Sequence, residues 1–306
     1  MNAMHNINNK KRFSIKLYTP SFILTLITTV IALSVFIKPS IAESIVYENI
    51  TDLSALHAQI KKDNPNKEST LVIFDIDDTL LESSNFVGSG KWYNWQRGRE
   101  VFDPTGESFI IDKAQQFHCM FRTLGTLFEI GSTHLTQSNA IDIFNQQKTY
   151  DLLILTARTA KYRVATEREL KKHNIDLSSE HFKESGSGYD YQFNDGNRTA
   201  RVTYKNGFIM SSGLNKGLVL EDFLEKTNRK YKNIYFIDDS LKNVTNIQQV
   251  WNDKTDLIKI FHYTKVDKTV SEDEIKESDK AKFYFDGFLK NAYPEQLTAF
   301  QNNNCN

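Results

Sequence analysis

The sequence predicts an α/β fold, a three-layer, Rossmann-like parallel sheet with an inserted, mainly helical cap. Two observations lead to this prediction. Short apolar runs recur along the chain, and several are followed by a polar turn and then by apolar residues at helical spacing. This alternation is typical of a parallel sheet that helices cover on both faces. The aromatic-rich segment 82–150 interrupts the alternation and therefore indicates an insertion.

The predicted strands are short apolar runs, and three of them lead into predicted helices. The strands are expected at Leu71–Phe74, Leu152–Leu155, Phe208–Met210, Ile234–Ile237 and Ile258–Phe261. The helices are expected within 156–173, 211–226 and 238–251. Ligands of such sheets bind at the carboxyl ends of the strands. The residues that directly follow each strand are therefore the first candidates for a functional site.

The expected domain organisation divides the chain behind its N-terminal segment into two parts. Residues 43–81 and 151–306 form the sheet-containing core, and residues 82–150 form the cap insertion. Aromatic residues early in the insertion could stack on a substrate or form the core of the cap. We expect the insertion to be helical from about 112 to 144. Hairpin-turn signals within 189–211 predict a small antiparallel excursion of the main sheet.

Composition and charge restrict the class of protein. The 306 residues are 40% hydrophobic and 25% charged, which excludes a disordered chain, a collagen-like fibre and a disulfide-rich miniprotein. Lys+Arg and Asp+Glu both number 38, but five of the cations and none of the acids lie within residues 1–42. Residues 43–306 therefore carry a net charge of −5. This mildly acidic body argues against nucleic-acid binding, which requires clustered cations.

The N-terminal segment has the pattern of a secretory signal peptide. Residues 22–37 are uncharged and mostly apolar, a basic stretch precedes them, and the small residues Ser40 and Ala42 follow. This order predicts a signal peptide over 1–42, cleaved after Ala42, and a secreted or periplasmic protein. The uncharged run extends back to Leu17 and is long enough for an uncleaved membrane anchor, and a buried core helix is a third interpretation. We expect no other contact with the membrane.

The sequence does not determine whether the two cysteines form a disulfide or are free thiols. Cys119 and Cys305 are the only cysteines of the chain. In an oxidising compartment they could pair, although 186 positions separate them. The alternative is a buried thiol at Cys119 and a free thiol in the tail.

Acidic residues follow two predicted strands directly, which is costly because like charges repel and burial penalises each of them. The acids are Asp75, Asp77 and Asp78 after the first strand, and Asp238 and Asp239 after the fourth. If these strands are neighbours, the carboxylates meet at one edge of the sheet. A hard cation such as Mg²⁺ would relieve the repulsion. A single acid here could be a strand-end turn or a helix cap, notably Asp78 or Asp239, but two clusters predict a metal site.

Two further residues fit the binding of an anion. Thr156 ends a predicted strand, where its hydroxyl and the adjacent backbone N–H groups could hold a phosphate, or where it could be a plain helix cap. Lys216 lies at the start of a predicted helix, where a cation opposes the helix dipole. A lysine at this position is favourable if both it and the helix end face an anion.

Four motifs together resemble those of the haloacid dehalogenase (HAD) superfamily of phosphohydrolases. The motifs are FDIDDTLL at 74–81, LLILTAR at 152–158, Lys216 within SSGLNKG, and IYFIDDS at 234–240. The insertion lies at the family's first cap position, between the first and second motifs. The signal peptide and FDIDDTLL also resemble secreted bacterial acid phosphatases. The stretch GSGKWYNWQ at 88–96 is similar to an uncharacterised family of secreted HAD-like proteins.

The resemblance implies a catalytic role for four residues. Asp75 would attack phosphorus and become an aspartyl phosphate. Asp77 would protonate the leaving oxygen and then activate water, and Thr156 and Lys216 would bind the transferring phosphoryl group. Arg158 could add a phosphate or substrate contact, or could be a solvent-facing helix charge.

The resemblance also implies a magnesium site. Mg²⁺ would be held by the Asp75 side chain, the Asp77 backbone carbonyl and Asp238, with Asp239 as a ligand or nearby. The metal would let the anionic Asp75 approach an anionic substrate.

We therefore expect a secreted, Mg²⁺-dependent phosphomonoester hydrolase, an HAD-type acid phosphatase that acts on a small phosphorylated molecule. One alternative is a binding or host-interaction module that keeps the HAD fold without turnover. The other is a phosphotransferase that uses the same residues. The oligomeric state stays open.

Overall fold

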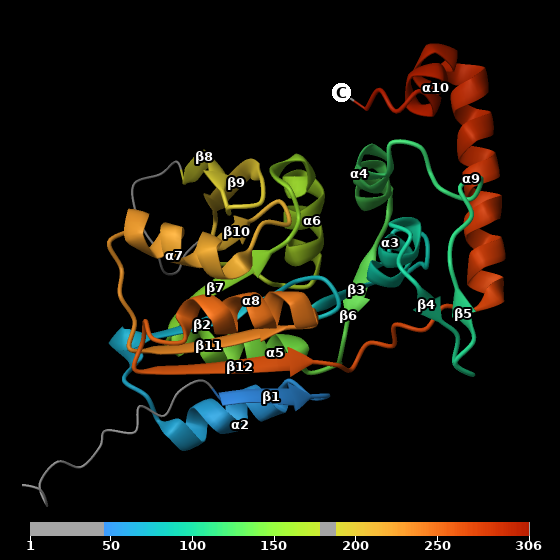
Figure 1. Cartoon of the computed structure of the whole chain (residues 1–306). Helices are drawn as coiled ribbons and strands as arrows, with labels where there is room; N and C mark the ends of the chain where they lie inside the picture. The colour runs from blue at the N-terminus through green and yellow to red at the C-terminus, as the bar shows by residue number, and fades with distance from the viewer. Residues whose placement is uncertain (1–45, 178–187, 306) are drawn as a thin grey trace, which may run out of the picture. The chain divides into compact units, whose positions relative to one another are not determined.

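The computed structural model describes residues 46–177 and 188–305 (Figure 1). The chain divides into a unit of residues 1–42 and a unit of residues 43–306, and the account below concerns the second. The expected signal peptide therefore lies outside the described residues. Over the described ranges, no helix has both the length and the apolar character needed to cross a membrane.

One eight-stranded sheet organises this unit and confirms the predicted α/β class. In sheet order the strands are β1 (Val46–Ile50), β12 (Leu257–Tyr263), β11 (Asn233–Asp238), β2 (Thr70–Phe74), β7 (Asp151–Thr156), β10 (Phe208–Met210), β9 (Thr199–Lys205) and β8 (Tyr189–Asn194). The pairs from β1 through β10 are parallel. The pairs β10–β9 and β9–β8 are antiparallel, as the hairpin-turn signals predict.

Each face of the sheet carries its own hydrophobic core. In β2, Val72 and Phe74 belong to one core, and Leu71 and Ile73 belong to the other. All four side chains are completely buried. A strand covered on both faces must be apolar at every position, which explains its uninterrupted apolar run.

Helices cover both faces and complete the three layers. The first core includes residues of α2 (Ser54–Asp63), α5 (Ala140–Gln146) and α6 (Arg163–Lys172), and the second includes residues of α7 (Lys216–Lys226) and α8 (Leu241–Trp251). Figure 1 shows α7 and α8 together over one face. Short 3₁₀ helices precede β2, β7 and α6: η1 (Lys67–Ser69), η2 (Gln147–Thr149) and η3 (Ala160–Tyr162). We call the sheet and these helices the sheet lobe.

The inserted segment contains short elements rather than one long helix. Its elements are β3 (Leu81–Ser83), α3 (Gly90–Gln96), β4 (Val101–Phe102), β5 (Ser108–Phe109), α4 (Met120–Ile130) and β6 (Thr133–Leu135), followed by α5 and η2, of which α5 packs into the first core of the sheet. Of the region expected to be helical from about 112 to 144, residues 120–130 and 140–146 form the helices α4 and α5 and residues 133–135 form β6, so the expectation is confirmed only in part. Helix α4 ends at Gly131, whose N–H donates to the Leu127 carbonyl at 2.7 Å. A Cβ on Gly131 would lie 2.6 Å from that oxygen, so glycine allows the chain to leave the helix and pair β6 with β3.

The C-terminal helices α9 (Glu272–Ala292) and α10 (Pro294–Gln301) pack on the inserted segment. The Trp92 indole N–H donates to the Ser278 hydroxyl at 2.9 Å, and Cys119 forms a disulfide with Cys305. The expected domain organisation places residues 151–306 in the core, whereas these contacts join the last helices to the insertion. We call residues 84–131 and 270–305 the side lobe.

Several aromatic residues of the insertion form the core of the side lobe. Trp92 and Trp95 are 0% and 1% exposed and pack with Phe86, Phe117 and Val270. Of the two interpretations of these tryptophans, the structure supports the core and excludes a stacking platform.

Candidate functional site

The site begins where two neighbouring parallel strands end. Strand β11 pairs with β2 so that Ile237 lies opposite Phe74, and the Asp75 N–H donates to the Ile237 carbonyl at 3.0 Å. Asp75 and Asp238 are the next residues of the two strands, so the register alone brings their side chains to the same edge of the sheet.

Lys216 joins these two acids. Its ammonium donates to Asp75 Oδ1 and to Asp238 Oδ2, both at 2.7 Å. The side chains of Lys216 and Asp238 are 0% exposed and that of Asp75 is 6% exposed, so solvent screens the three charges little. Burial and the neighbouring Asp238 raise the pKa of Asp75 well above its usual range. Burial alone would lower the pKa of Lys216, but Asp238 and Asp75 outweigh it and raise that pKa.

The position of Lys216 is set by the packing of its helix. The Asn215 side chain accepts from the N–H groups of Gly217 and Leu218 and caps α7. A Cβ at Gly217 would lie 2.5 Å from the carbonyl oxygen of Asn246, so this glycine lets α7 approach α8 closely. The Trp251 indole N–H also donates to the Gly217 carbonyl at 3.1 Å. The start of α7 is therefore held against α8.

Asp239 completes an acidic triad. One carboxylate oxygen of each of Asp75, Asp238 and Asp239 lies within 4.8 Å of the others. Burial, together with Asp238 and Asp78, raises the pKa of Asp239 to about 7 despite the nearby Lys268. Three buried carboxylates that disfavour one another's ionisation fit a hard divalent cation, which prefers oxygen ligands. The Asn243 side chain donates to Asp238 Oδ1 at 3.0 Å and orients that carboxylate.

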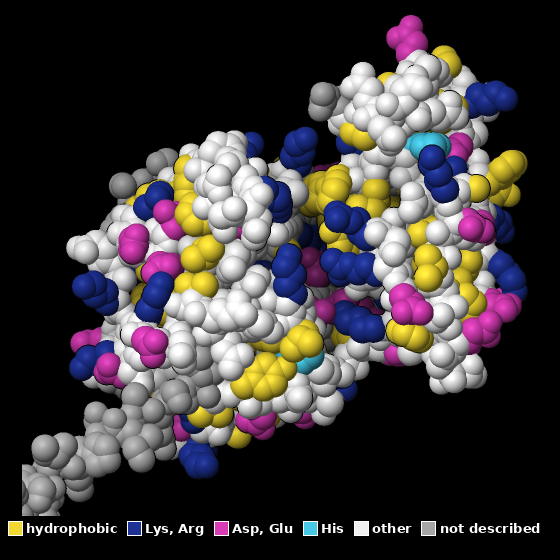
Figure 2. Space-filling view, viewed as in Figure 1, with side chains coloured by type: hydrophobic (Ala, Val, Ile, Leu, Met, Phe, Trp, Pro, Cys, Tyr) yellow, Lys and Arg dark blue, Asp and Glu magenta, His cyan; other side chains and the backbone are white. Residues whose placement is uncertain are grey.

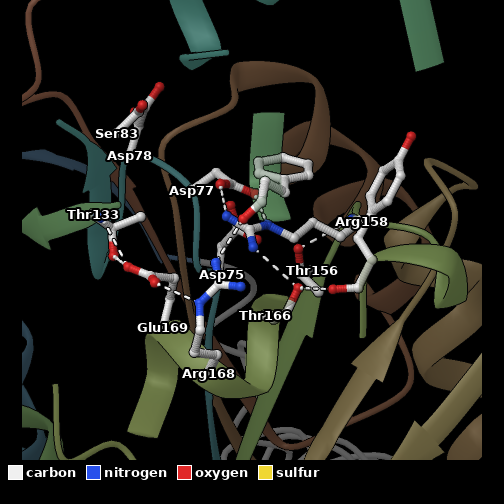
Figure 3. Close-up of polar contacts among 12 residues, drawn as sticks. Asp75, Asp77, Asp78, Ser83, Thr133, Thr156, Arg158, Thr166, Arg168 and Glu169 are labelled. Atoms are coloured by element: carbon white, nitrogen blue, oxygen red, sulfur yellow. Dashed lines mark hydrogen bonds and ion pairs between the residues drawn. The ribbon is translucent and has the colours of Figure 1, made fainter. Parts of the chain in front are cut away.

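A second group of predicted residues lies at the end of the neighbouring strand β7. Arg158 binds Asp77 with two hydrogen bonds, of 3.0 Å from Nε and 2.7 Å from a terminal nitrogen (Figure 3). The Thr156 hydroxyl accepts from the Arg158 backbone N–H at 3.1 Å. The Arg158 guanidinium also donates to Thr166 and lies 4.2 Å from the centre of the Phe128 ring. Arg158 is therefore a buried, fully paired cation and not a solvent-facing helix charge.

This pairing controls the ionisation of Asp77. Burial would raise the pKa of Asp77, but the guanidinium of Arg158 outweighs it and lowers that pKa. The Asp77 side chain is still 42% exposed, so a ligand can reach it. In this arrangement Asp77 is a carboxylate, and it becomes a proton donor only if Arg158 moves to another anion.

Asp78 is linked to the triad through Lys268 and faces the side lobe at Gly90. Its backbone is left-handed (φ 56°), and its carboxylate faces Gly90, where a Cβ would lie 2.2 Å from Asp78 Oδ2. Lys268, from the segment between β12 and α9, forms ion pairs with Asp78 and with Asp239, the latter at 2.9 Å. Sequence reasoning missed Lys268 because it lies 190 positions after Asp78, and no local pattern marks it.

A pocket that is partly open to solvent adjoins Asp77 and Arg158. Its wall comes from both lobes and comprises Asp77, Asp78, Ser83, Asn85, Val87, Gly88, Ser89, Gly90, Leu127, Phe128, Gly131, Ser132, Thr133, Arg158 and Glu169. Figure 2 shows a hollow between the two lobes, where basic and acidic side chains gather. Sequence reasoning also missed Phe128 and Glu169. Phe128 is one apolar residue of a mostly apolar helix, and Glu169 is one of several charged residues of a charged helix, so neither stands out in the sequence.

Fold and site together define a Rossmann-like, three-layer α/β protein with a buried lysine–carboxylate centre at the carboxyl edge of its sheet. The chain belongs to the family described as "Protein of unknown function (DUF2608)", whose family model matches residues 49–296. A search of the curated proteins found no match to the chain.

Proposed function

We propose that this protein is a Mg²⁺-dependent phosphomonoester hydrolase of the HAD type that works through an aspartyl phosphate on Asp75. The observation that carries the proposal is the centre in which Lys216 joins Asp75 and Asp238, with Asp239 beside them. A buried nucleophile, a fixed cation and a triad of oxygen ligands are what phosphoryl transfer requires, since its catalysis is mostly positioning and positive charge.

Asp75, Asp238 and Asp239 would hold the metal, together with the Asp77 backbone carbonyl, and Mg²⁺ bound there would neutralise charge on Asp75 and on the phosphoryl oxygens. In the first step, Asp75 forms a bond to phosphorus while the ester P–O bond breaks. Asp77 gives a proton to the departing alkoxide oxygen. In the second step, Asp77 takes a proton from the water that attacks phosphorus, and the Asp75 carboxylate departs.

Arg158 and Thr156 would bind the phosphoryl group before the chemistry. In the ligand-free arrangement Arg158 is bound to Asp77. A phosphate monoester offers Arg158 a doubly charged anion with matching bidentate geometry. Transfer of the guanidinium from Asp77 to the phosphate would raise the pKa of Asp77 and let it carry the proton of the first step.

The same ion pair favours a second candidate, a binding or host-interaction module without turnover. If Arg158 never leaves Asp77, the general acid stays ionised and hydrolysis fails. A phosphotransferase would use the same residues and would differ only in transferring the phosphoryl group to an alcohol, so added glycerol would yield a phosphorylated product.

We also propose that the protein is exported. The disulfide between Cys119 and Cys305 supports this, because such bonds persist in oxidising compartments. The sequence pattern of residues 1–42, which predicts a signal peptide, points the same way.

The direct test is hydrolysis of an aryl phosphate by the full chain with Mg²⁺ and with a chelator. We expect phosphate release that requires the metal and that falls by about 1,000-fold or more in Asp75→Asn. Asp190→Asn is the matched control, because Asp190 is exposed on β8 and pairs with Arg201. Full activity of Asp75→Asn would refute the mechanism, and no turnover of any phosphate ester by the wild-type chain would favour the binding module.

A further inference from the structure

Phe128 of α4 contacts both lobes. It packs against the first core of the sheet lobe and against the core of the side lobe. Its ring lies 5.1 Å from the ring of Tyr162, centre to centre, and its backbone carbonyl accepts from Arg168 at 2.7 Å. The Tyr162 hydroxyl in turn donates to the Phe121 carbonyl at 2.6 Å. These contacts fix α4 against η3 and α6, so the packing of the two lobes sets the position of the Phe128 ring.

The Phe128 ring is also part of the surroundings of Arg158. The guanidinium lies over this ring, 4.2 Å from its centre, while its nitrogens donate to Asp77 and Thr166 (Figure 3). The Thr166 hydroxyl donates to the Tyr162 carbonyl at 2.7 Å, and the Arg158 side chain is only 4% exposed. The sheet lobe therefore supplies the hydrogen-bond partners of this cation, and the side lobe supplies the ring beside it.

A ring in this position strengthens the binding of an anion by Arg158. The face of an aromatic ring attracts a guanidinium and keeps it in place, and the ring also excludes water from it. With less water nearby, the cation attracts an anion more strongly, and a phosphate dianion gains more than the single charge of Asp77. The contact with the ring does not depend on which anion the guanidinium binds, so it can persist when phosphate replaces Asp77.

We infer that Phe128 is a positioning residue, through which the side lobe holds the Arg158 guanidinium in place for Asp77 in the ligand-free protein and for the phosphoryl group in the proposed reaction. The second part of the inference rests on the proposed function. Packing of α4 on the sheet lobe then becomes a condition for tight phosphate binding.

The first test measures hydrogen exchange of the Arg158 Nε–H by NMR in the full chain with labelled arginine, the resonance being assigned by its absence in Arg158→Lys. This proton is donated to Asp77 at 3.0 Å and should exchange slowly. Phe128→Leu keeps an apolar side chain but removes the ring, and it should make the exchange about tenfold faster, the effect of losing a desolvated cation–π contact. Phe121→Leu is the matched control, because it removes from the same helix a ring that lies 5.6 Å from another guanidinium, that of Arg97. This control should leave the exchange of the Arg158 proton unchanged.

The second test measures the binding of substrate and phosphate. Phe128→Leu should raise KM for an aryl phosphate about tenfold and leave kcat within about twofold, because Arg158 holds the phosphoryl group both before and during the reaction. Calorimetry with inorganic phosphate should show the same loss of affinity. Phe128→Tyr keeps the ring and should retain the wild-type values, and Phe121→Leu should again have no effect.

Several results would overturn the assignment. These are an exchange rate that Phe128→Leu does not change, an equal acceleration in Phe121→Leu, and a loss in Phe128→Tyr as large as that in Phe128→Leu. A fall in kcat with an unchanged KM would also overturn it, since it would indicate a general structural defect.

The exchange measurement separates this inference from the proposed function, because it requires no turnover. Faster exchange and weaker phosphate binding in Phe128→Leu, with no hydrolysis by the wild-type chain, would support the positioning role and refute the proposed function. Hydrolysis by the wild-type chain, with exchange and KM unchanged in Phe128→Leu, would refute the positioning role alone.

Discussion

Replacement of Lys216 by methionine should strongly destabilise the metal-free protein. Methionine retains most of the apolar side chain of lysine but removes the ammonium that lies 2.7 Å from both Asp75 and Asp238. Two buried carboxylates would then face each other without a cation. Removal of one partner from a buried ion pair costs about 3–5 kcal/mol, and we expect a loss of this size in the free energy of unfolding.

The assay is chemical denaturation at neutral pH with and without Mg²⁺. A divalent ion held by the same acids should take over the neutralisation, so Mg²⁺ at about 100 times its Kd should recover about 2–3 kcal/mol in Lys216→Met. Lys226→Met is the matched control on the same helix, because Lys226 is 39% exposed and its ammonium pairs with Asp222 four residues earlier and lies over the Tyr191 ring. The control should change stability by about 0.5 kcal/mol or less.

Two results would refute this reasoning. A loss of about 1 kcal/mol or less in Lys216→Met would mean that the ammonium is not buried between the acids. A large loss that Mg²⁺ does not reduce would mean that the acids do not bind the ion.

Two further predictions concern the same edge of the sheet. The pKa of Asp239 is raised to about 7 in the folded protein, so folding favours its protonated form. The stability that this form contributes is present at low pH and is lost as the pH rises toward 7. Denaturation of the metal-free chain should show a decrease of up to about 2 kcal/mol between about pH 5.5 and about pH 7, which Asp239→Asn removes; an unchanged profile in that variant would contradict the assignment. Lys268→Met leaves Asp78 and Asp239 without their shared cation. Hydrogen exchange over residues 264–271 should then become about tenfold faster, whereas the exposed Lys265→Met should have no effect, and equal rates in both variants would contradict a linking role for Lys268.

The sequence predicted those elements whose burial leaves a pattern in a short stretch of the chain. Strands β2, β7 and β11 read as apolar runs because helices cover them on both faces, and the acids that follow β2 and β11 could be placed together because parallel neighbours end at one edge. Strand β1 was missed. Its sequence has no uninterrupted apolar run like that of β2, because β1 is an edge strand that pairs with β12 alone and most of its side chains are not buried.

The rest depends on contacts between distant residues. The packing of α9 on α3 involves Trp92 and Ser278, which lie 186 positions apart, and nothing local to either residue indicates its partner. The same holds for the site. The sequence identified Asp77 and Arg158 as separate candidates, but their ion pair depends on how β2 and β7 end side by side. That ion pair lowers the pKa of Asp77, and nothing in the motif around Asp77 indicates it.

The most direct test of the account is a crystal structure of the full chain with Mn²⁺, in which the anomalous signal locates the ion. We expect a single strong peak at the carboxyl ends of β2 and β11, within bonding distance of carboxylate oxygens of Asp75 and Asp238, with Asp239 as a ligand or hydrogen-bonded to one. A structure in which Mn²⁺ binds elsewhere, while Lys216 remains bound to both carboxylates, would contradict the account.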